Sequence, residues 1–218
     1  EIGVRLVGSE MCIRDRSKAE AEKYVSPGDC AYFRSDYTEL GNGYLREKAL
    51  DDRIGCAIMV DILNKDLPYD VTCVFTVQEE IGTRGAKVAA YTVKPDYAIV
   101  LETTTACDFS GNDGEKRVCE LGKGCVVSYM DRSTIYDREL YRLGFEKAKE
   151  INVPCQTKTL VAGGNDSGAI HSSVGGIRTV ALSVPCRYLH SPSCMIKKSD
   201  VQSTAELAYA MYLALAEK

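Results

Sequence analysis

The sequence predicts an α/β fold, with a mixed, mainly parallel sheet that is flanked by helices. From residue 48 onward, apolar strand-like runs alternate with segments whose apolar residues recur at helical spacing, which is the pattern of successive β-α-β units. Two of the runs are almost continuously apolar, as expected of strands that are covered on both faces. With 218 residues, of which 45% are hydrophobic, the chain can bury the core of one principal domain.

The first elements expected in this fold are a buried helix and two interior strands. Residues 53–65 are apolar almost all round, so we expect a largely buried helix there. One stripe of this helix carries Ile54, Ala57, Ile58 and Ile62. Residues 71–77 (VTCVFTV) and 97–101 (YAIVL) are short apolar runs rich in strand-favouring residues, and we expect both to be interior strands of the sheet.

Two further helices are expected in the second half of the chain. The first spans residues 136–151, and the second closes the sequence. This last helix is amphipathic, because Glu206 and Glu217 face away from its apolar stripe. The stripe consists of Ala205, Ala208, Tyr212 and Leu215. Asp200 and Ser203 precede that stripe, and their side-chain oxygens are predicted to cap the helix.

The first 47 residues have a different character, with weak periodicity, several glycines and a patchwork of charges. Residues 9–16 (SEMCIRDR) fit neither neighbouring segment. This octapeptide resembles a translated sequencing-adapter sequence, although an ordinary polar loop is the alternative. We therefore expect residues 1–16 to be a truncated or non-native N-terminus.

Charge and hydropathy argue against two classes of partner. The formal net charge is −4 with both signs interspersed, so the sequence lacks the basic stripe with which a nucleic-acid binder neutralises phosphates. No apolar run approaches the roughly 20 residues needed to cross a bilayer, and the N-terminal residues lack the pattern of a secretory signal. We therefore expect no nucleic-acid partner, no membrane partner and a cytoplasmic location.

The ten cysteines raise the alternatives of a disulfide framework or a zinc module. No Cys-x-x-Cys pair occurs, and Cys56, Cys73 and Cys186 lie in apolar stretches. Reduced cysteine in such a stretch usually behaves as a small hydrophobic residue. We expect these thiols to be reduced and inert.

Acidic pairs occur at two places where predicted elements begin or end. Asp51 and Asp52 precede the first predicted helix, where an aspartate commonly caps the free amides of the first turn. Glu79 and Glu80 directly follow the first predicted strand. Adjacent carboxylates repel each other unless a cation binds one of them or a proton is held by the other. A solvated loop is the alternative for this second pair.

Two more residues with metal-binding chemistry follow strand-like runs. Glu102 comes directly after the second predicted strand, where an unpaired buried carboxylate would require a cation or an exit to solvent. His190 is followed by Ser191-Pro192, which forces a turn. The second histidine, His171, is interpreted as structural or exposed. Because the carboxyl ends of strands in open α/β sheets form ligand-binding crevices, side chains from several such ends can converge.

The order of these motifs resembles one family of enzymes. The chain carries KALDDRIG, then QEEIGTRGA, then LETT, then GGNDSG and finally RYLHSP. This series is similar to that of the glutamyl-aminopeptidase and tetrahedral-aminopeptidase family of dinuclear metallopeptidases, some members of which are labelled endoglucanases. The resemblance runs from about residue 17 to the C-terminus. It implies a zinc-peptidase-like fold and hydrolysis of N-terminal residues from peptide substrates.

The resemblance also implies a role for each candidate residue. Asp51 would bridge two divalent metal ions, Glu80 and His190 would complete one site, and Glu102 would belong to the other. Glu79 would be the general base, free of metal. The family often has aspartate in place of Glu102, and the longer side chain should still reach. Zinc or cobalt suits these ligands, and manganese is also compatible with a carboxylate-rich set.

The chain departs from the family pattern near its N-terminus. A histidine of a His-x-Asp motif, which supplies a fifth ligand in the family, has no counterpart in this sequence. We expect residues 17–47 to be a remnant of an inserted small β-domain and residues 48–218 to be the catalytic domain. We accordingly expect this chain to hold one metal ion tightly and to have impaired activity. For the intact protein we expect a homo-oligomer.

Two other functions are weighed against this one. A non-catalytic α/β subunit or binding module would keep the fold without metal-dependent peptide hydrolysis. A cysteine-dependent redox protein would need a thiol of depressed pKa near a cation, and the missing Cys-x-x-Cys motif argues against it.

Overall fold

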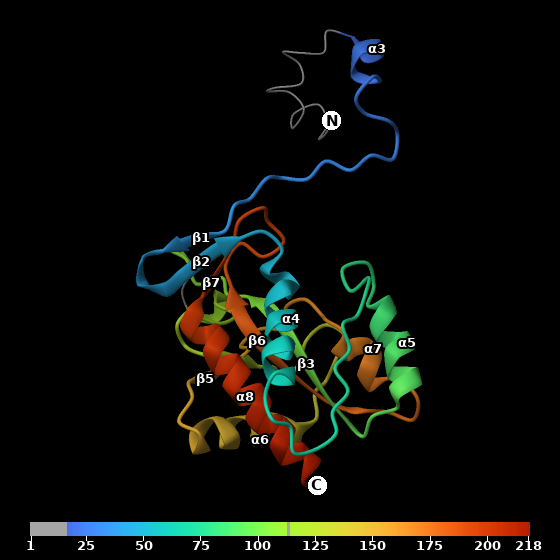
Figure 1. Ribbon diagram of the computed structural model, residues 1–218. Coiled ribbons are helices and arrows are strands. Elements are labelled where there is room, and N and C mark those ends of the chain that lie inside the picture. Colours follow the sequence, from blue (N-terminus) through green and yellow to red (C-terminus); the bar gives the residue numbers. More distant parts are fainter. Residues whose placement is uncertain (1–16, 113) are drawn as a thin grey trace. The chain divides into compact units, whose positions relative to one another are not determined.

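The computed structural model describes residues 17–112 and 114–218, and the chain divides into two compact units between Arg34 and Ser35. In the first unit, helix α3 (Lys18–Ala21) follows Ser17, whose Oγ accepts a 3.3 Å hydrogen bond from the backbone N–H of Glu20. The expectation for residues 1–16 falls outside the described residues. Figure 1 shows the chain coloured along its sequence.

The centre of the second unit is a four-stranded mixed sheet. Its order is β3-β6-β4-β5, formed by β3 (Tyr97–Thr105), β6 (Arg178–Cys186), β4 (Cys125–Val127) and β5 (Cys155–Thr157). β3 runs parallel to β6, and β4 runs parallel to β5, whereas β4 and β6 are antiparallel. The expected mixed sheet is therefore confirmed, with parallel pairs on both sides of a single antiparallel one.

A second, smaller sheet is entirely antiparallel. It has the order β1-β2-β7 and contains β1 (Thr38–Leu40), β2 (Tyr44–Glu47) and β7 (Cys194–Lys197), with the short 3-10 turn η1 (Gly41–Gly43) between its first two strands. A second such turn, η2, spans Gly114–Lys116. The small sheet thus joins residues near 40 to a strand near the C-terminus, and the domain boundary expected between residues 47 and 48 stays a prediction.

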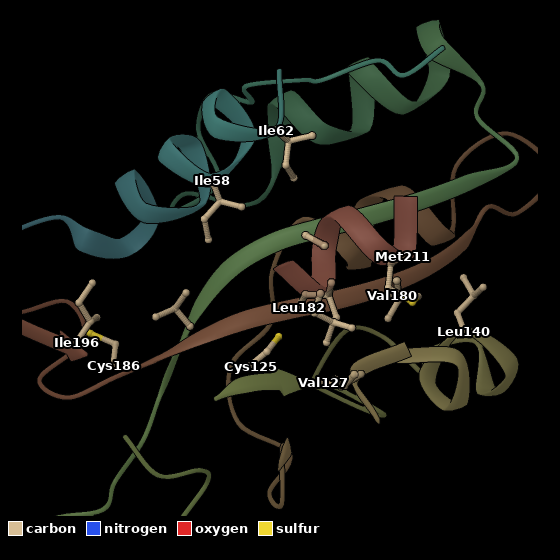
Figure 2. Close-up of a cluster of buried hydrophobic side chains, with 14 of the residues drawn as sticks. Ile58, Ile62, Cys125, Val127, Leu140, Val180, Leu182, Cys186, Ile196 and Met211 are labelled. Atoms are coloured by element: carbon tan, nitrogen blue, oxygen red, sulfur yellow. The ribbon is translucent and has the colours of Figure 1, made fainter. Parts of the chain in front are cut away.

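Three helices cover one face of the mixed sheet: α4 (Leu50–Leu63), α6 (Arg138–Glu150) and α8 (Lys198–Ala216). Figure 2 shows their apolar side chains meeting those of the strands. The helices contribute Ile58, Ile62, Leu140 and Met211, and the strands contribute Val127, Val180 and Leu182, all of them buried. Because β6 is apolar almost throughout and covered, burial of its side chains stabilises the domain.

Two shorter helices lie side by side away from that core: α5 (Arg84–Val93) and α7 (Ser167–His171) (Figure 1). A separate apolar cluster forms where Ile170 of α7 packs with Val100 of β3 and Ala181 of β6. Ala181 alternates along β6 with residues of the main core, so it points to the opposite face of the sheet. No helix in the described residues has the length and hydropathy needed to cross a membrane.

The helices expected from sequence are confirmed, with one error at a helix start. The predicted spans 53–65 and 136–151 correspond to α4 and α6 within a few residues. The prediction that Asp200 caps the last helix is wrong, because α8 already begins at Lys198. The Asp200 carboxylate instead accepts hydrogen bonds from the backbone N–H groups of Gly122 at 2.7 Å and Gly124 at 2.9 Å.

The interior strand expected at residues 71–77 is not formed. This segment has no ladder partner among the described residues, and Phe75 and Val77 keep 47% and 67% of their surface exposed. A strand exists only when its backbone N–H and C=O groups pair with a neighbour. Residues 71–77 therefore have the apolar pattern of a strand but belong to no sheet in the described part of the chain.

Candidate metal centre

Asp51 lies where the chain turns from β2 into α4. Ala49 adopts a left-handed conformation (φ 55°), and Asp51 itself has non-helical backbone angles. The capping role falls to Asp52, whose Oδ1 accepts a 3.0 Å hydrogen bond from the backbone N–H of Gly55. A Cβ at position 55 would overlap the Asp52 carboxylate, so glycine is required there. The capping interpretation thus holds for Asp52 and leaves the Asp51 carboxylate available.

Glu79 and Glu80 lie in a turn between residues 71–77 and α5. The turn is closed by a 3.0 Å hydrogen bond from the backbone N–H of Gly85 to the carbonyl oxygen of Val77. A Cβ on Gly85 would collide with the backbone of Val77, which explains the glycine. Within the turn, Gln78 has a positive φ of 61°, a conformation that non-glycine residues adopt rarely. This backbone directs the two carboxylates differently, so that Glu79 is half-buried and Glu80 is exposed.

His190 lies in the loop between β6 and β7. The ends of this loop are joined by two backbone hydrogen bonds between Arg187 and Met195, of 2.9 and 3.0 Å. His190 has a φ of 59°, and its Nε2 lies 2.9 Å from Oδ2 of Asp51 and 3.3 Å from Oε2 of Glu80. The imidazole therefore faces both carboxylates, although the three residues are far apart in sequence.

These three side chains form a first group that could hold a metal ion. One ligand atom from each of Asp51, Glu80 and His190 lies within 4.8 Å of the others. Ligands at about 2.0–2.2 Å from a zinc ion lie some 3–4 Å from one another. The two distances at the imidazole are 3.3 Å, which falls within that spacing, and 2.9 Å, which is just below it.

A second group shares Asp51 with the first. It consists of Asp51, Asp52 and Glu102, again with ligand atoms within 4.8 Å of one another. Glu102 was expected just beyond its strand, but β3 continues to Thr105 and Glu102 lies inside it. The strand therefore carries a carboxylate into the partly buried interior, where Lys158 is close enough for its charge to interact with that of Glu102.

The electrostatics of both groups favour a bound cation. Burial, together with the neighbouring carboxylates, raises the pKa of Glu102 to about 11, that of Asp52 to about 8 and that of Glu79 to about 7. Repulsion of this kind is relieved when a cation lies between the carboxylates. Oxygen and imidazole donors are ligands that zinc and related divalent ions accept. The donor set therefore fits the metal chemistry expected from sequence.

Sequence reasoning assigned no metal-binding or catalytic role to two acids near the site. Asp52 lies in the second ligand group, and its only sequence signal was its position beside Asp51. Asp166 is buried, accepts a 2.6 Å hydrogen bond from Thr76 Oγ1 and raises the pKa of Glu79 and of Asp52. It belongs to the GGNDSG motif, but nothing local distinguishes it from a loop aspartate. His171 packs as a structural residue, with Nδ1 2.8 Å from the carbonyl oxygen of Ser167.

The fold and the site define an α/β protein with a candidate centre for divalent metal ions at one end of its sheet. The sequence pattern of the M42 glutamyl aminopeptidases matches residues 10–207, and the chain belongs to this family.

Individual relatives agree with this assignment. A protein of Acetivibrio thermocellus, provisionally named an aminopeptidase, is 41% identical over 88% of this chain and 58% of its own length. The structure of an aminopeptidase from the archaeon Desulfurococcus kamchatkensis matches with a TM-score of 0.84 and 32% identity, over 89% of this chain and 56% of that one. The Pyrococcus horikoshii TET1 peptidase matches with a TM-score of 0.77 and 34% identity, over 92% and 58%. The chain thus spans little more than half the length of these relatives.

Proposed function

We propose that this chain is part of a metal-dependent aminopeptidase that removes N-terminal residues from peptides. One observation carries the proposal: two potential ligand groups share Asp51, and Glu79 lies beside them without belonging to either. Family membership supports the reaction class. A non-catalytic α/β subunit would have no reason to gather five carboxylates whose mutual repulsion destabilises the metal-free protein.

The residues divide into ligands and a base. Asp51, Glu80 and His190 would hold one divalent ion, and Asp51 with Glu102 would contribute to a second, for which the geometry also offers Asp52. Bound divalent ions supply a water of lowered pKa and polarise the scissile carbonyl. Zinc, cobalt or manganese each suits such ligands.

Glu79 is the proposed general base. An effective base has a pKa near the working pH, and burial together with the carboxylates of Asp166 and Glu80 brings the pKa of Glu79 to about 7. Glu79 would accept a proton from the attacking water and pass it to the leaving amine. Asp166 would assist by holding the carboxylate of Glu79 at this pKa, since its own carboxylate is fixed by Thr76.

The number of tightly held ions is a separate part of the proposal. The first group combines an imidazole with two carboxylates, whereas the second contains carboxylates only. We propose that this chain holds one ion tightly at Asp51, Glu80 and His190, and that its hydrolytic activity is weak. Equilibrium dialysis against zinc, followed by metal analysis, tests this: two tightly bound ions per chain would contradict it.

Hydrolysis of aminoacyl chromogenic substrates distinguishes the enzyme from a binding module. Release of the chromophore that requires a divalent ion and stops with a chelator supports the aminopeptidase. A chain that binds zinc but shows no release above a His190→Ala control, at any concentration of metal, would favour the non-catalytic alternative.

Assembly and location complete the proposal. The Pyrococcus horikoshii relative is described as assembling into a tetrahedron or an octahedral shell. We propose that the intact protein is likewise a homo-oligomer that acts on peptides in the cytoplasm. Size-exclusion chromatography with light scattering tests the first part.

A further inference from the structure

Two buried thiols flank the loop that carries His190. Cys186 ends β6 and Cys194 begins β7, so residues 187–193 connect them. Both side chains are almost completely buried, with 0% and 1% of their surface exposed. Neither residue belongs to the ligand groups, and the proposed chemistry uses neither thiol.

The strand register places the two thiols on one face. Arg187 and Met195 are directly opposite each other across an antiparallel bridge. Side chains alternate along a strand, so Cys186 and Cys194 both point to the face opposite Arg187 and lie diagonally across the bridge. The two thiols lie close enough to shift each other's pKa, and each also reaches a backbone carbonyl oxygen of the loop: Cys186 Sγ that of Arg187 at 3.3 Å, and Cys194 Sγ that of Ser191 at 3.5 Å.

The two thiols differ in pKa because they are close to each other. The interaction with the side chain of Cys186, joined by backbone hydrogen bonds that include Leu50 and Ala49, lowers the pKa of Cys194 to about 6, and the same interaction raises the pKa of Cys186. A thiolate is the reactive form of cysteine, and a protonated neighbour can resolve its oxidised product. By contrast, burial raises the pKa of Cys119 well above its ordinary value and raises that of Cys125 to about 12.

We propose that Cys186 and Cys194 form a redox modification site, in which a peroxide converts the two thiols into a disulfide that closes the His190 loop. The Cys194 thiolate attacks one peroxide oxygen, the O–O bond breaks, and the departing hydroxide takes up a proton to leave as water. The sulfur of Cys186 then attacks the resulting sulfenic acid; the S–S bond forms, and the hydroxyl group leaves with the thiol proton as a second water. The peroxide gains the two electrons that the thiols lose.

Closing this disulfide alters the candidate metal centre. Diagonal neighbours across an antiparallel pair are about 7–8 Å apart, whereas the Cα atoms of a disulfide are usually about 4.4–6.8 Å apart. The bond therefore pulls the two ends of the loop together. His190 lies in that loop, and Leu50, whose backbone contacts Cys194, immediately precedes Asp51. The consequence for metal binding rests on the proposed function, whereas the disulfide itself does not.

Peptide mapping of the wild-type chain tests the modification directly. The reduced chain is treated with hydrogen peroxide, alkylated while unfolded and digested with trypsin without reduction. Cleavage after Arg187 separates the two cysteines into peptides 179–187 and 188–197, each with one cysteine. We expect these peptides to be joined, with the mass lowered by two hydrogens, and to separate on reduction. Recovery of both as alkylated peptides, at a dose that oxidises the exposed Cys30, would overturn the proposal.

Variants supply matched controls. Cys186→Ser should abolish the link and leave Cys194 as a sulfenic acid that a dione probe traps, whereas Cys125→Ser, which removes another buried thiol, should leave the link intact. If both variants lost the link equally, core packing alone would control disulfide formation, and the proposed pairing of Cys186 with Cys194 would be refuted.

Zinc affinity measured before and after oxidation tests the coupling. We expect oxidation to weaken binding by about tenfold or more, because repositioning a ligand has effects of that size. Unchanged affinity would refute the coupling but leave the disulfide standing. Absence of zinc binding in both states, with the disulfide formed, would instead refute the proposed function.

Discussion

At the scale of single residues, Glu79 and Glu80 show how neighbours in sequence acquire different chemistry. Glu80 is exposed and contacts His190 at 3.3 Å, whereas Glu79 is half-buried near Asp166. The turn that separates them depends on Gly85, which allows the chain to pass close to Val77. The local backbone thus makes one carboxylate a candidate ligand and the other a candidate base.

Replacing each glutamate separates these roles. We expect Glu79→Gln to leave zinc content unchanged and to reduce metal-dependent hydrolysis by about 10²–10⁴-fold, the usual contribution of a general base. Glu80→Gln should lower zinc affinity instead. Metal analysis and a chromogenic peptidase assay on both variants measure this, and loss of zinc from the Glu79 variant alone would reverse the two assignments.

The raised carboxyl pKa values predict a pH dependence of stability for the metal-free chain. The pKa values of Glu79 and Asp52 are about 7 and about 8, above their ordinary values of 4.5 and 3.8. At pH values between the ordinary and the raised pKa, the folded chain therefore binds more protons than the unfolded chain. The free energy of unfolding should therefore be highest near pH 4 and fall as the pH rises toward 8. Urea unfolding at about pH 5 and at about pH 8, with a chelator present to remove metal, measures this free energy.

Glu102→Gln provides the control, because it removes a third carboxyl group of raised pKa. Its stability should depend less steeply on pH, and added zinc should flatten the dependence of the wild-type chain. A free energy of unfolding that rises over this range in the chelator would show that the carboxylates do not repel one another as described.

Most of the candidate site could be predicted at this scale. The sequence motifs contain residue types that commonly bind metal ions, and they include Asp51, Glu79, Glu80, Glu102 and His190. Asp166 and Lys158 could not be found, because their effect on the site comes from three-dimensional proximity and burial. The thiol pair was likewise missed, since eight positions separate Cys186 from Cys194 and only the strand pairing brings the sulfur atoms together.

At the scale of elements, α6 depends on a few fully buried side chains. Leu140 has no exposed surface and packs in the main core (Figure 2). We expect Leu140→Ala to lower the free energy of unfolding by about 2–5 kcal/mol, through lost burial and the cavity left behind. Val88→Ala, at a site of α5 that is 68% exposed, is the control and should change it by less than about 1 kcal/mol. Equal losses in urea unfolding would contradict this packing.

A second element depends on Asp200. Its carboxylate accepts two backbone hydrogen bonds, from Gly122 and Gly124, and so holds the loop before β4 against α8. Asp200→Ala would leave both N–H groups without a partner, and we expect it to cost about 1–3 kcal/mol. Urea unfolding of this variant beside Glu206→Ala, an exposed acid on the same helix, measures the difference. A loss no greater than that of the control would mean that water replaces the carboxylate.

Helices could be predicted better than strands, for a physical reason. α4, α6 and α8 satisfy their backbone hydrogen bonds within one segment, so apolar spacing alone indicates them. Residues 71–77 have an equally clear apolar pattern but depend on a neighbour for pairing, and none is present in the described residues. The start of α8 was misplaced because Asp200, a good capping residue by type, is engaged by a distant loop.

At the scale of the whole molecule, the candidate centre depends on long-range topology. Asp51, Glu80, Glu102 and His190 come from the start of α4, the turn before α5, strand β3 and the loop between β6 and β7. The fold brings these four segments to one end of the mixed sheet, as open α/β sheets commonly do for ligand sites. The spatial convergence, rather than any single motif, is what the proposed function requires.

The most direct test is anomalous X-ray diffraction from crystals of the chain grown with zinc. We predict a strong zinc peak within about 2.0–2.2 Å of ligand atoms from Asp51, Glu80 and His190. Glu79 should lie outside the coordination sphere. Crystals saturated with zinc in which these three side chains are more than a coordination sphere apart, or in which the metal binds elsewhere, would contradict the proposed centre.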